Sequence, residues 1–151
     1  MYIKYAKTRD VKDPIRANAG DAIDVFIPNN FNATGKRILP SQNIVIPTGL
    51  KFEVPFGYAL MFVNKSGVAA KKSLIIGACL IDHGYSGEVH LDIHNIGSET
   101  RYLTNGMKLG QLIQIPVMTP SLLCVLEEDL YKQVPLVSER GEGKMGSTND
   151  K

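Results

Sequence analysis

Residues 77–95, GACLIDHGYSGEVHLDIHN, contain the pattern that decides the fold class. An apolar run ends at Asp82, and from Glu88 onward apolar and polar residues alternate, as in a strand with one buried face. Two glycines between these segments allow a tight turn. The stretch therefore predicts a β-hairpin that presents the Asp82 carboxylate and the Tyr85 ring together at its mouth. Such a pair suits a small planar or sugar-bearing ligand.

Similar short apolar segments recur along the chain, separated by turns that contain Gly, Pro or Asn. Their period of two and their Val and Ile content are typical of strands. We expect strands at residues 23–27, 43–54, 58–63, 74–81, 88–94 and 107–117. The pattern of residues 121–132 is compatible with a strand or a helix, and we expect a strand there as well. One short helix is expected at residues 66–73. The sequence thus predicts an all-β sandwich or barrel with one short helix.

Length and composition predict a single domain with a tail. At 151 residues the chain is long enough to bury a core without disulfides or a structural metal. Apolar density falls and glycine content rises after Pro135. We therefore expect a packed domain over residues 1–137 and a flexible C-terminal tail over residues 138–151.

Charge and cysteine content narrow the class of protein. The chain has 17 Lys+Arg against 15 Asp+Glu, and a formal net charge of +2 does not indicate a nucleic-acid or membrane partner. No apolar run approaches the roughly 18 residues of a membrane span, and the N-terminus lacks a signal-peptide core. Cys79 and Cys124 lie in apolar runs, where a free cysteine usually behaves as a small buried apolar residue. These features predict a cytoplasmic protein.

The C-terminal stretch ERGEGKMGSTND, residues 139–150, has the residue types of a phosphate-binding loop but not its spacing. Ser138 stands where the first glycine of such a loop is required, and Met145 follows Lys144 where Ser or Thr is required. Too few residues follow to form the helix that completes a phosphate loop. Two readings remain: a flap that closes on a site built elsewhere, or an ordinary disordered terminus.

Three other positions carry candidate chemistry. A carboxylate at the end of a buried strand, such as Asp82, can hold and deprotonate a water, or it can simply cap a turn. Lys65 and Ser66 stand at the expected helix start, where N–H groups converge on anions. Gln111 lies inside an apolar strand, and a buried amide needs a hydrogen-bond partner.

Five segments in chain order carry a resemblance to a known family: NAGDAIDV, KSGVAAK, GACLIDHGYSGEV, NGMKLGQLI and RGEGKMGST. Their order and spacing resemble the five motifs of the trimeric dUTP pyrophosphatases, and the match covers nearly the whole chain. The resemblance implies a jelly-roll-like fold and a homotrimer with three active sites, each assembled from all three subunits. It also implies that the C-terminal tail closes over a neighbouring subunit's site.

The resemblance implies hydrolysis of dUTP to dUMP and pyrophosphate. Asp82 would orient the water that attacks the α-phosphorus, and Tyr85 would pack against deoxyribose so that a 2′-hydroxyl has no room. Main-chain groups of the hairpin would read uracil. The residues implied there are Cys79, Ile81, Glu88 and Val89.

The other motifs would hold the triphosphate. Lys65, Ser66, Gly67 and Gln111 would contact phosphate oxygens, with Asp24 of the first motif in a supporting role. In the tail, Arg140 would clamp the γ-phosphate. The remaining tail residues would cover the base or contact phosphates, and they are Met145, Gly146, Ser147 and Thr148. Mg²⁺ would bridge phosphate oxygens and bind the protein mostly through water.

Several positions depart from the family pattern. Lys65 stands where the second motif usually has Arg, and an ammonium cannot make the same bidentate contacts. In the tail, Met145 replaces an aromatic residue and Lys144 replaces a glycine. Cys79 replaces a glycine of the third motif.

Two alternative functions remain on the sequence alone. The first is dCTP deamination, alone or combined with dUTP hydrolysis in a bifunctional enzyme. The related dCTP deaminases place a general-base carboxylate further along the hairpin, and Asp92 in LDIHN occupies that region. A non-enzymatic regulatory protein that responds to dUTP is the other alternative. His90 and His94 share a strand face with Asp92, but residues four apart on a strand lie about 13 Å apart, too far for one metal ion.

Overall fold

The computed structural model describes residues 2–16, 20–31 and 36–132, and the chain divides into two compact units. The first unit is Met1–Thr119 and the second is Pro120–Lys151. The expected domain boundary at residue 137 lies outside the described residues. Within those residues, no helix has the length and hydropathy needed to cross a membrane.

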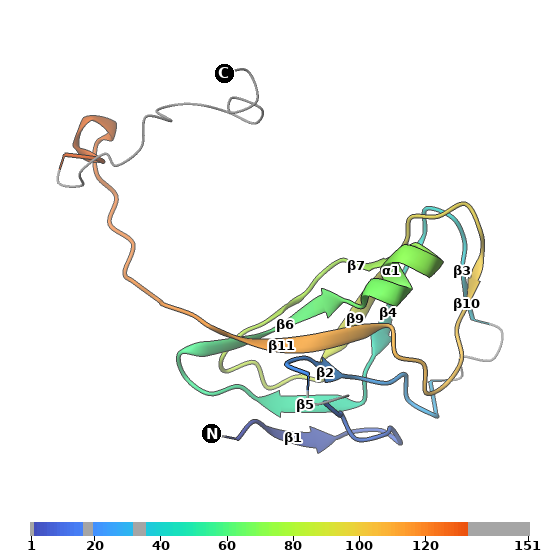
Figure 1. Ribbon diagram of the computed structural model, residues 1–151. Coiled ribbons are helices and arrows are strands. Elements are labelled where there is room, and N and C mark those ends of the chain that lie inside the picture. Colours follow the sequence, from blue (N-terminus) through green and yellow to red (C-terminus); the bar gives the residue numbers. More distant parts are fainter. Residues whose placement is uncertain (1, 17–19, 32–35, 133–151) are drawn as a thin grey trace. The chain divides into compact units, whose positions relative to one another are not determined.

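The first unit is built from short strands and one helix (Figure 1). The strands are β1 (Lys4–Lys7), β2 (Ile23–Asp24), β3 (Arg37–Ile38), β4 (Asn43–Pro47), β5 (Leu50–Glu53), β6 (Tyr58–Asn64), β7 (Leu74–Ile76), β8 (Leu80–Ile81), β9 (His90–Asn95), β10 (Arg101–Tyr102) and β11 (Gly110–Pro116). The helix α1 spans Ser66–Lys72.

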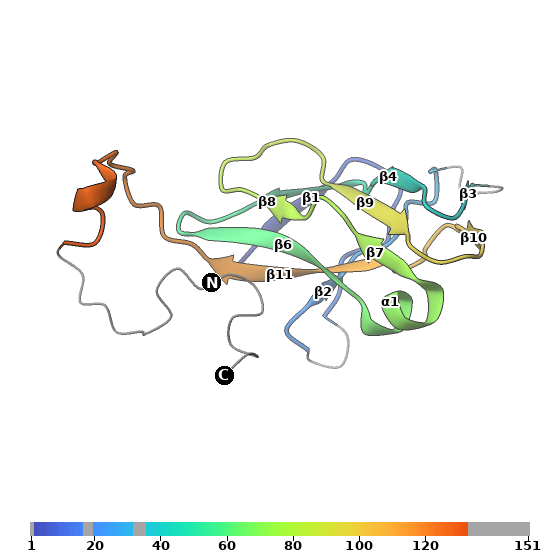
Figure 2. The same ribbon diagram turned by 90° about the horizontal axis from the view of Figure 1, so that it is seen from above.

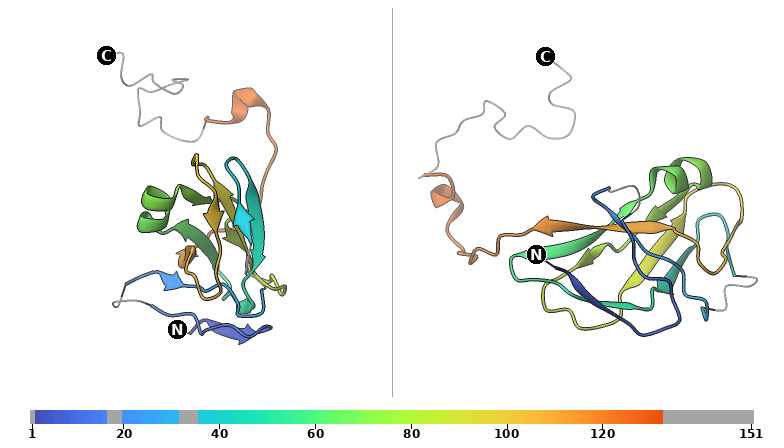
Figure 3. Two further views of the ribbon diagram at one scale, coloured as in Figure 1. Left: turned by 90° about the vertical axis from the view of Figure 1, so that its right-hand side faces the viewer. Right: turned by 60° about the horizontal axis from the view of Figure 1, so that its bottom comes forward.

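Two larger sheets and two strand pairs enclose the core. One larger sheet has the strand order β2-β11-β6-β8 and the other β4-β9-β7, and the pairs are β1 with β5 and β3 with β10. All pairings are antiparallel, and β11 runs beside β6 over its whole length (Figure 3). A Cβ added to Gly110 of β11 would lie 2.9 Å from Leu91 Cδ1 and 3.0 Å from Ile76 Cδ1. The two sheets therefore pack closely face to face, and Gly110 makes room for side chains of β9 and β7.

The predicted fold class is confirmed: the unit consists of β-strands with one short helix. The helix lies where it was expected, and its last turn carries Lys71 and Lys72, whose charges complement the negative end of the helix dipole. It ends at Ser73 in the left-handed conformation, with φ of 53°. Val68 packs against the core and attaches the helix to the sheets.

Two expected strands are broken in the structure. Residues 43–54 form β4 and β5, because the chain turns at Gly49, where φ is +75°. Residues 74–81 form β7, which pairs with β9, and β8, which pairs with β6. In both places the chain passes from one sheet to another. The second break places the end of β8, and therefore Asp82, in the sheet that contains β6.

Four further expectations are corrected. β11 begins at Gly110, three residues later than expected, and only Ile23–Asp24 of the expected strand at residues 23–27 pairs as a strand. The segment 121–132 contains no strand; its only regular element among the described residues is a 3₁₀-helix at Glu127–Asp129. Cys124 in this segment is exposed rather than buried. Among the described residues of the second unit, up to residue 132, no strand covers the apolar residues of this segment.

Candidate functional site

A pocket of about 260 Å³ lies at the mouth of the hairpin that the sequence predicts. Its lining comes from β6, from β8 with the link before it and the turn after it, and from the start of β9. The lining residues are Phe62, Ala78, Cys79, Leu80, Ile81, Asp82, Tyr85, Val89 and His90. The pocket thus unites Asp82 and Tyr85 with three of the four residues expected to read uracil.

The turn after β8 presents Asp82 and Tyr85 as expected. Tyr85 N donates to Asp82 O at 3.2 Å, and Gly84 has a φ of +84°, which an L side chain rarely adopts. Asp82 is exposed, and its carboxylate has no hydrogen bond or ion pair with any residue that the structure describes. The carboxylate is therefore available to a water or a ligand.

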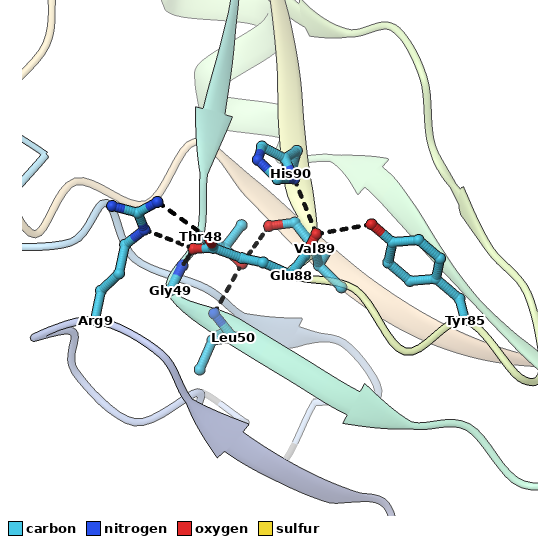
Figure 4. A network of polar contacts seen from close by, with 8 residues as sticks. All are labelled: Arg9, Thr48, Gly49, Leu50, Tyr85, Glu88, Val89 and His90. Carbon is cyan, nitrogen blue, oxygen red and sulfur yellow. Dashed lines mark hydrogen bonds and ion pairs between the residues drawn. The ribbon is translucent and has the colours of Figure 1, made fainter.

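Glu88, the fourth residue of the uracil-reading group, does not line the pocket with its side chain. Its carboxylate accepts hydrogen bonds from Arg9 Nε at 2.7 Å, Arg9 Nη2 at 3.2 Å and Gly49 N at 2.8 Å (Figure 4). The Arg9 guanidinium holds the pKa of this carboxyl below its usual range. The main-chain carbonyl of Glu88 accepts the Tyr85 hydroxyl at 2.9 Å, and His90 Nδ1 lies 2.9 Å from the same oxygen.

A second polar group surrounds Asp24, which is 3 % exposed. Lys108 Nζ donates to Asp24 Oδ2 at 2.9 Å, and Lys65 Nζ donates to Asp24 Oδ1. Lys65 Nζ also lies 3.5 Å from Gln111 Oε1. Burial raises the pKa of the Asp24 carboxyl, but the hydrogen bonds and charges of both lysines outweigh burial and leave the pKa below its ordinary value. Two ammonium groups on one carboxylate leave this cluster with a net positive charge.

The remaining members of the expected phosphate site lie near this cluster. Gln111 Nε2 donates to Asn64 O at 3.3 Å, so its half-buried amide has the partner that the sequence required. Ser66 and Gly67 are exposed at the start of α1, and Lys65 at the N-cap makes no side-chain capping bond. Sequence reasoning missed Lys108, although it lies within the NGMKLGQL segment, three residues before Gln111.

Asp82 and the Asp24 cluster lie at opposite edges of the four-stranded sheet. β8, which leads to Asp82, and β2, which carries Asp24, are its two edge strands, and three strand spacings separate them by about 14 Å. Along β6, Leu60 lies opposite Ile81, whereas Lys65 follows the far end, about 16 Å further on. Figure 2 shows α1 following one end of β6, whereas β8 lies beside the middle of that strand. Within one chain, Asp82 and the Asp24 cluster are therefore about 20 Å apart.

Asp92 does not line the pocket, and its carboxylate is already occupied. Asn43 Nδ2 donates to it at 3.0 Å and Ala78 N at 3.2 Å, while His94 Nε2 lies 3.0 Å from Oδ2. Burial raises the pKa of Asp92, but these contacts outweigh it and lower the pKa below its usual value. His90 and His94 have different partners, and among the described residues no three His, Cys, Asp or Glu side chains form a metal-binding group.

The expected tail residues lie outside the described part of the chain. They are Arg140, Met145, Gly146, Ser147 and Thr148. The pocket and the Asp24 cluster are therefore the two parts of the expected site that the structure describes.

Proteins similar to this chain are dUTP-hydrolysing enzymes by name. The deoxyuridine 5'-triphosphate nucleotidohydrolase of Chlamydia trachomatis serovar L2 is 32% identical over 115 residues, which are 75% of each chain. The enzyme of the same name from Chlamydia caviae is 30% identical over 116 residues, which are 76% of each chain.

Solved structures show the same fold. A mutant dUTPase of Staphylococcus bacteriophage 80alpha with dUpNHpp has a TM-score of 0.78 at 23% identity, over 97% of this chain and 98% of that one. A mutant dUTPase of phage phi11 of S. aureus, described with a structural Mg(II) ion, has a TM-score of 0.71 at 23% identity, over 84% and 98%. The family model described as dUTPase matches residues 9–149 of this chain. The chain belongs to the dUTPase family.

Proposed function

We propose that this protein hydrolyses dUTP to dUMP and pyrophosphate at sites that the subunits of a homotrimer share. Membership of the dUTPase family supports the reaction. The main support for a site shared between subunits is the distance of about 20 Å between Asp82 and the Asp24 cluster within one chain. A single dUTP reaches both groups if they come from different subunits, as a symmetric trimer allows.

The pocket at the hairpin takes the nucleoside part of the substrate. A volume of about 260 Å³ suits a uracil base with its sugar, and the triphosphate then extends out of the pocket. Main-chain groups near Cys79, Ile81 and Val89 read the base. The Tyr85 ring packs against deoxyribose, where a 2′-hydroxyl would collide with it.

Asp82 acts as the general base. Its exposed carboxylate has no other partner among the described residues, so it can accept a hydrogen bond from a water at the pocket mouth. As the water oxygen bonds to the α-phosphorus, its proton passes to Asp82. The bond between that phosphorus and the bridging oxygen breaks, and pyrophosphate leaves with the electron pair.

The Asp24 cluster of another subunit holds the phosphates. Lys65 and Lys108 each share Asp24, and their side chains remain 24% and 38% exposed, so both ammonium groups can turn toward a triphosphate. Gln111, Ser66 and Gly67 add neutral hydrogen bonds. Electrostatic stabilisation of the charge that develops on the phosphates then supplies much of the catalysis.

Mg²⁺ fits this donor set only as an ion held by the substrate. The described residues near the pocket offer one unpaired carboxylate, that of Asp82, rather than a cage of oxygen ligands. Mg²⁺ commonly takes its remaining ligands from phosphates and water. When bound, it would neutralise phosphate charge and favour departure of pyrophosphate.

The tail completes the proposal. Residues 1–137 form the enzyme domain, and residues 138–151 close over a neighbouring subunit's site, where Arg140 holds the γ-phosphate. Met145 and Gly146 cover the base, and Ser147 and Thr148 contact phosphates. Free Cys79 and Cys124 support a cytoplasmic location, where thiols stay reduced.

The two alternative functions are not favoured. The named relatives are dUTP nucleotidohydrolases, and the Asp92 carboxylate that a deaminase would use is bonded to three other groups. A panel of deoxynucleoside triphosphates, with pyrophosphate and ammonia both measured, tests the proposal. We expect pyrophosphate from dUTP and no ammonia. Ammonia from dCTP with no pyrophosphate from dUTP would place the protein with the deaminases instead.

A further inference from the structure

The Tyr85 ring has little packing to hold it in place. It is 47% exposed, and its hydroxyl makes one hydrogen bond, to the main-chain carbonyl of Glu88 at 2.9 Å. The ring lies over Gly87, where an added Cβ would be 2.6 Å from Tyr85 Cζ. The orientation of the ring therefore depends on where the peptide after Glu88 points.

Contacts of the Glu88 side chain fix one end of that peptide. Its carboxylate, with 17% of the side chain exposed, accepts both Arg9 nitrogens and the N–H of Gly49. At the other end, Val89 N donates to Leu50 O at 2.8 Å. The Glu88 carbonyl that accepts the Tyr85 hydroxyl belongs to the same peptide group as Val89 N–H, and Figure 4 shows it together with the Arg9 and Gly49 contacts of the carboxylate.

Arg9 is itself fixed by the fold. Thr8 N donates to Gly49 O at 2.8 Å, and an added Cβ on Gly49 would lie 3.1 Å from Arg9 Cβ. A planar guanidinium with two parallel N–H groups matches a carboxylate in a way that an ammonium cannot. Arg9 thus connects the segment after β1 to the residue that precedes Val89 of the pocket, across 79 residues of sequence.

We propose that Arg9 is a positioning residue of the sugar site, which acts through Glu88 to hold the Tyr85 ring and so sets the preference for deoxyribose over ribose. The inference rests on the proposed function, because Tyr85 contacts the sugar only there. Arg9 does not line the pocket and touches no reacting atom. Its effect is confined to the geometry of the ring.

The first test observes the ring directly. The enzyme is labelled with 3-fluorotyrosine, and the Tyr85 signal among the six tyrosines is assigned from its loss in Tyr85→Phe. Arg9→Met should shift or broaden this fluorine resonance, and Glu88→Gln, which keeps an acceptor for Gly49 N, should do the same. Lys4→Met, which removes the exposed ion pair with Glu53 on β5, is the matched control and should leave the resonance unchanged. An unchanged Tyr85 resonance in both Arg9→Met and Glu88→Gln overturns the proposal.

The second test is kinetic. Arg9→Met should raise the KM for dUTP more than it lowers kcat. It should also reduce the ratio of kcat/KM for dUTP over UTP by about tenfold, below the roughly 100-fold that a 1 Å misplacement can cost. Arg9→Lys should recover part of the ratio. Because Arg9 acts through the Tyr85 hydroxyl, Arg9→Met should have no further effect in a Tyr85→Phe background.

The outcomes separate this inference from the proposed function. Additive effects of Arg9→Met and Tyr85→Phe, with each variant melting like the wild type, would show that Arg9 acts elsewhere and overturn the inference. A wild-type protein that does not hydrolyse dUTP contradicts the proposed function. In that case the fluorine spectra still decide whether Arg9 holds the ring.

Discussion

The Lys108 ammonium donates a hydrogen bond of 2.9 Å to the carboxylate of Asp24, although 84 residues separate them in the sequence. Lys65 donates to the other oxygen of the same carboxylate. Asp24 is therefore a buried anion that two cations neutralise, at the edge of the sheet where we place phosphate binding. Its removal affects both stability and the charge of the site.

Asp24→Asn should lower the free energy of unfolding by about 1–3 kcal/mol, since it removes the charged acceptor of two lysines that can still reach water. Urea unfolding at pH 7 and one fixed protein concentration measures this change. Asp21→Asn is the control, because Asp21 is exposed and lies three residues away. Equal stability of Asp24→Asn and Asp21→Asn would show that the cluster does not stabilise the fold.

The Asp24 carboxyl should also make the free energy of unfolding depend on pH. Its pKa in the folded state is lower than in the unfolded state, so its contribution is fully present above about pH 5. The contribution is lost as the pH falls below about 3.9 and through the lower folded pKa. Between pH 5 and 3 the wild type should therefore lose more unfolding free energy than Asp24→Asn does. Parallel losses in the two proteins would contradict a lowered pKa at Asp24.

Asp82→Asn should reduce kcat for dUTP by about 10²- to 10⁴-fold, because it keeps the shape of the side chain but removes the base. The affinity for a non-hydrolysable dUTP analogue, measured by calorimetry, should change little. Asp10→Asn, an exposed carboxylate outside the pocket, serves as the control. If Asp82→Asn keeps kcat within about threefold of the wild type, another group activates the water.

Mixed trimers test the shared site. Asp82→Asn and Lys65→Gln should each be poorly active alone, but a mixture that is dissociated and reassembled should regain activity. In a random mixture about one quarter of the sites combine an intact Asp82 from one subunit with an intact Lys65 from another. Light scattering should show a trimer for every sample. Sites built within single subunits would gain nothing from mixing.

Deletion of all residues after Val137 removes no strand of the first unit, which ends at Thr119. We therefore expect an unchanged melting temperature and a trimer, but a collapse of dUTP hydrolysis because the proposed lid over the triphosphate is lost. Arg140→Lys should reproduce part of this loss, since an ammonium replaces a planar fork on phosphate. Full activity of the truncated protein would mean that the tail does not close the site.

The sequence by itself determined the turns, strands and helix whose formation depends only on residues close together in the chain. The turn that carries Asp82 and Tyr85 follows from glycines that permit its backbone, and β6 follows from an apolar run between turn residues. The short helix was predictable for the same reason, because helices form from local hydrogen bonds. The order of the five motifs also indicated the family, which the comparisons confirm.

Only the tertiary structure decided which distant groups meet. An apolar run indicates burial but not the sheet that receives it, so the breaks at Gly49 and between β7 and β8 were not predictable. Likewise, any of many charged residues could have paired with Asp24 or Glu88. The strand register places Lys65 and Lys108 beside Asp24. The segment after β1, which packs against Gly49, places Arg9 beside Glu88. These pairings depend on three-dimensional proximity across 41 to 84 residues, which no local pattern encodes.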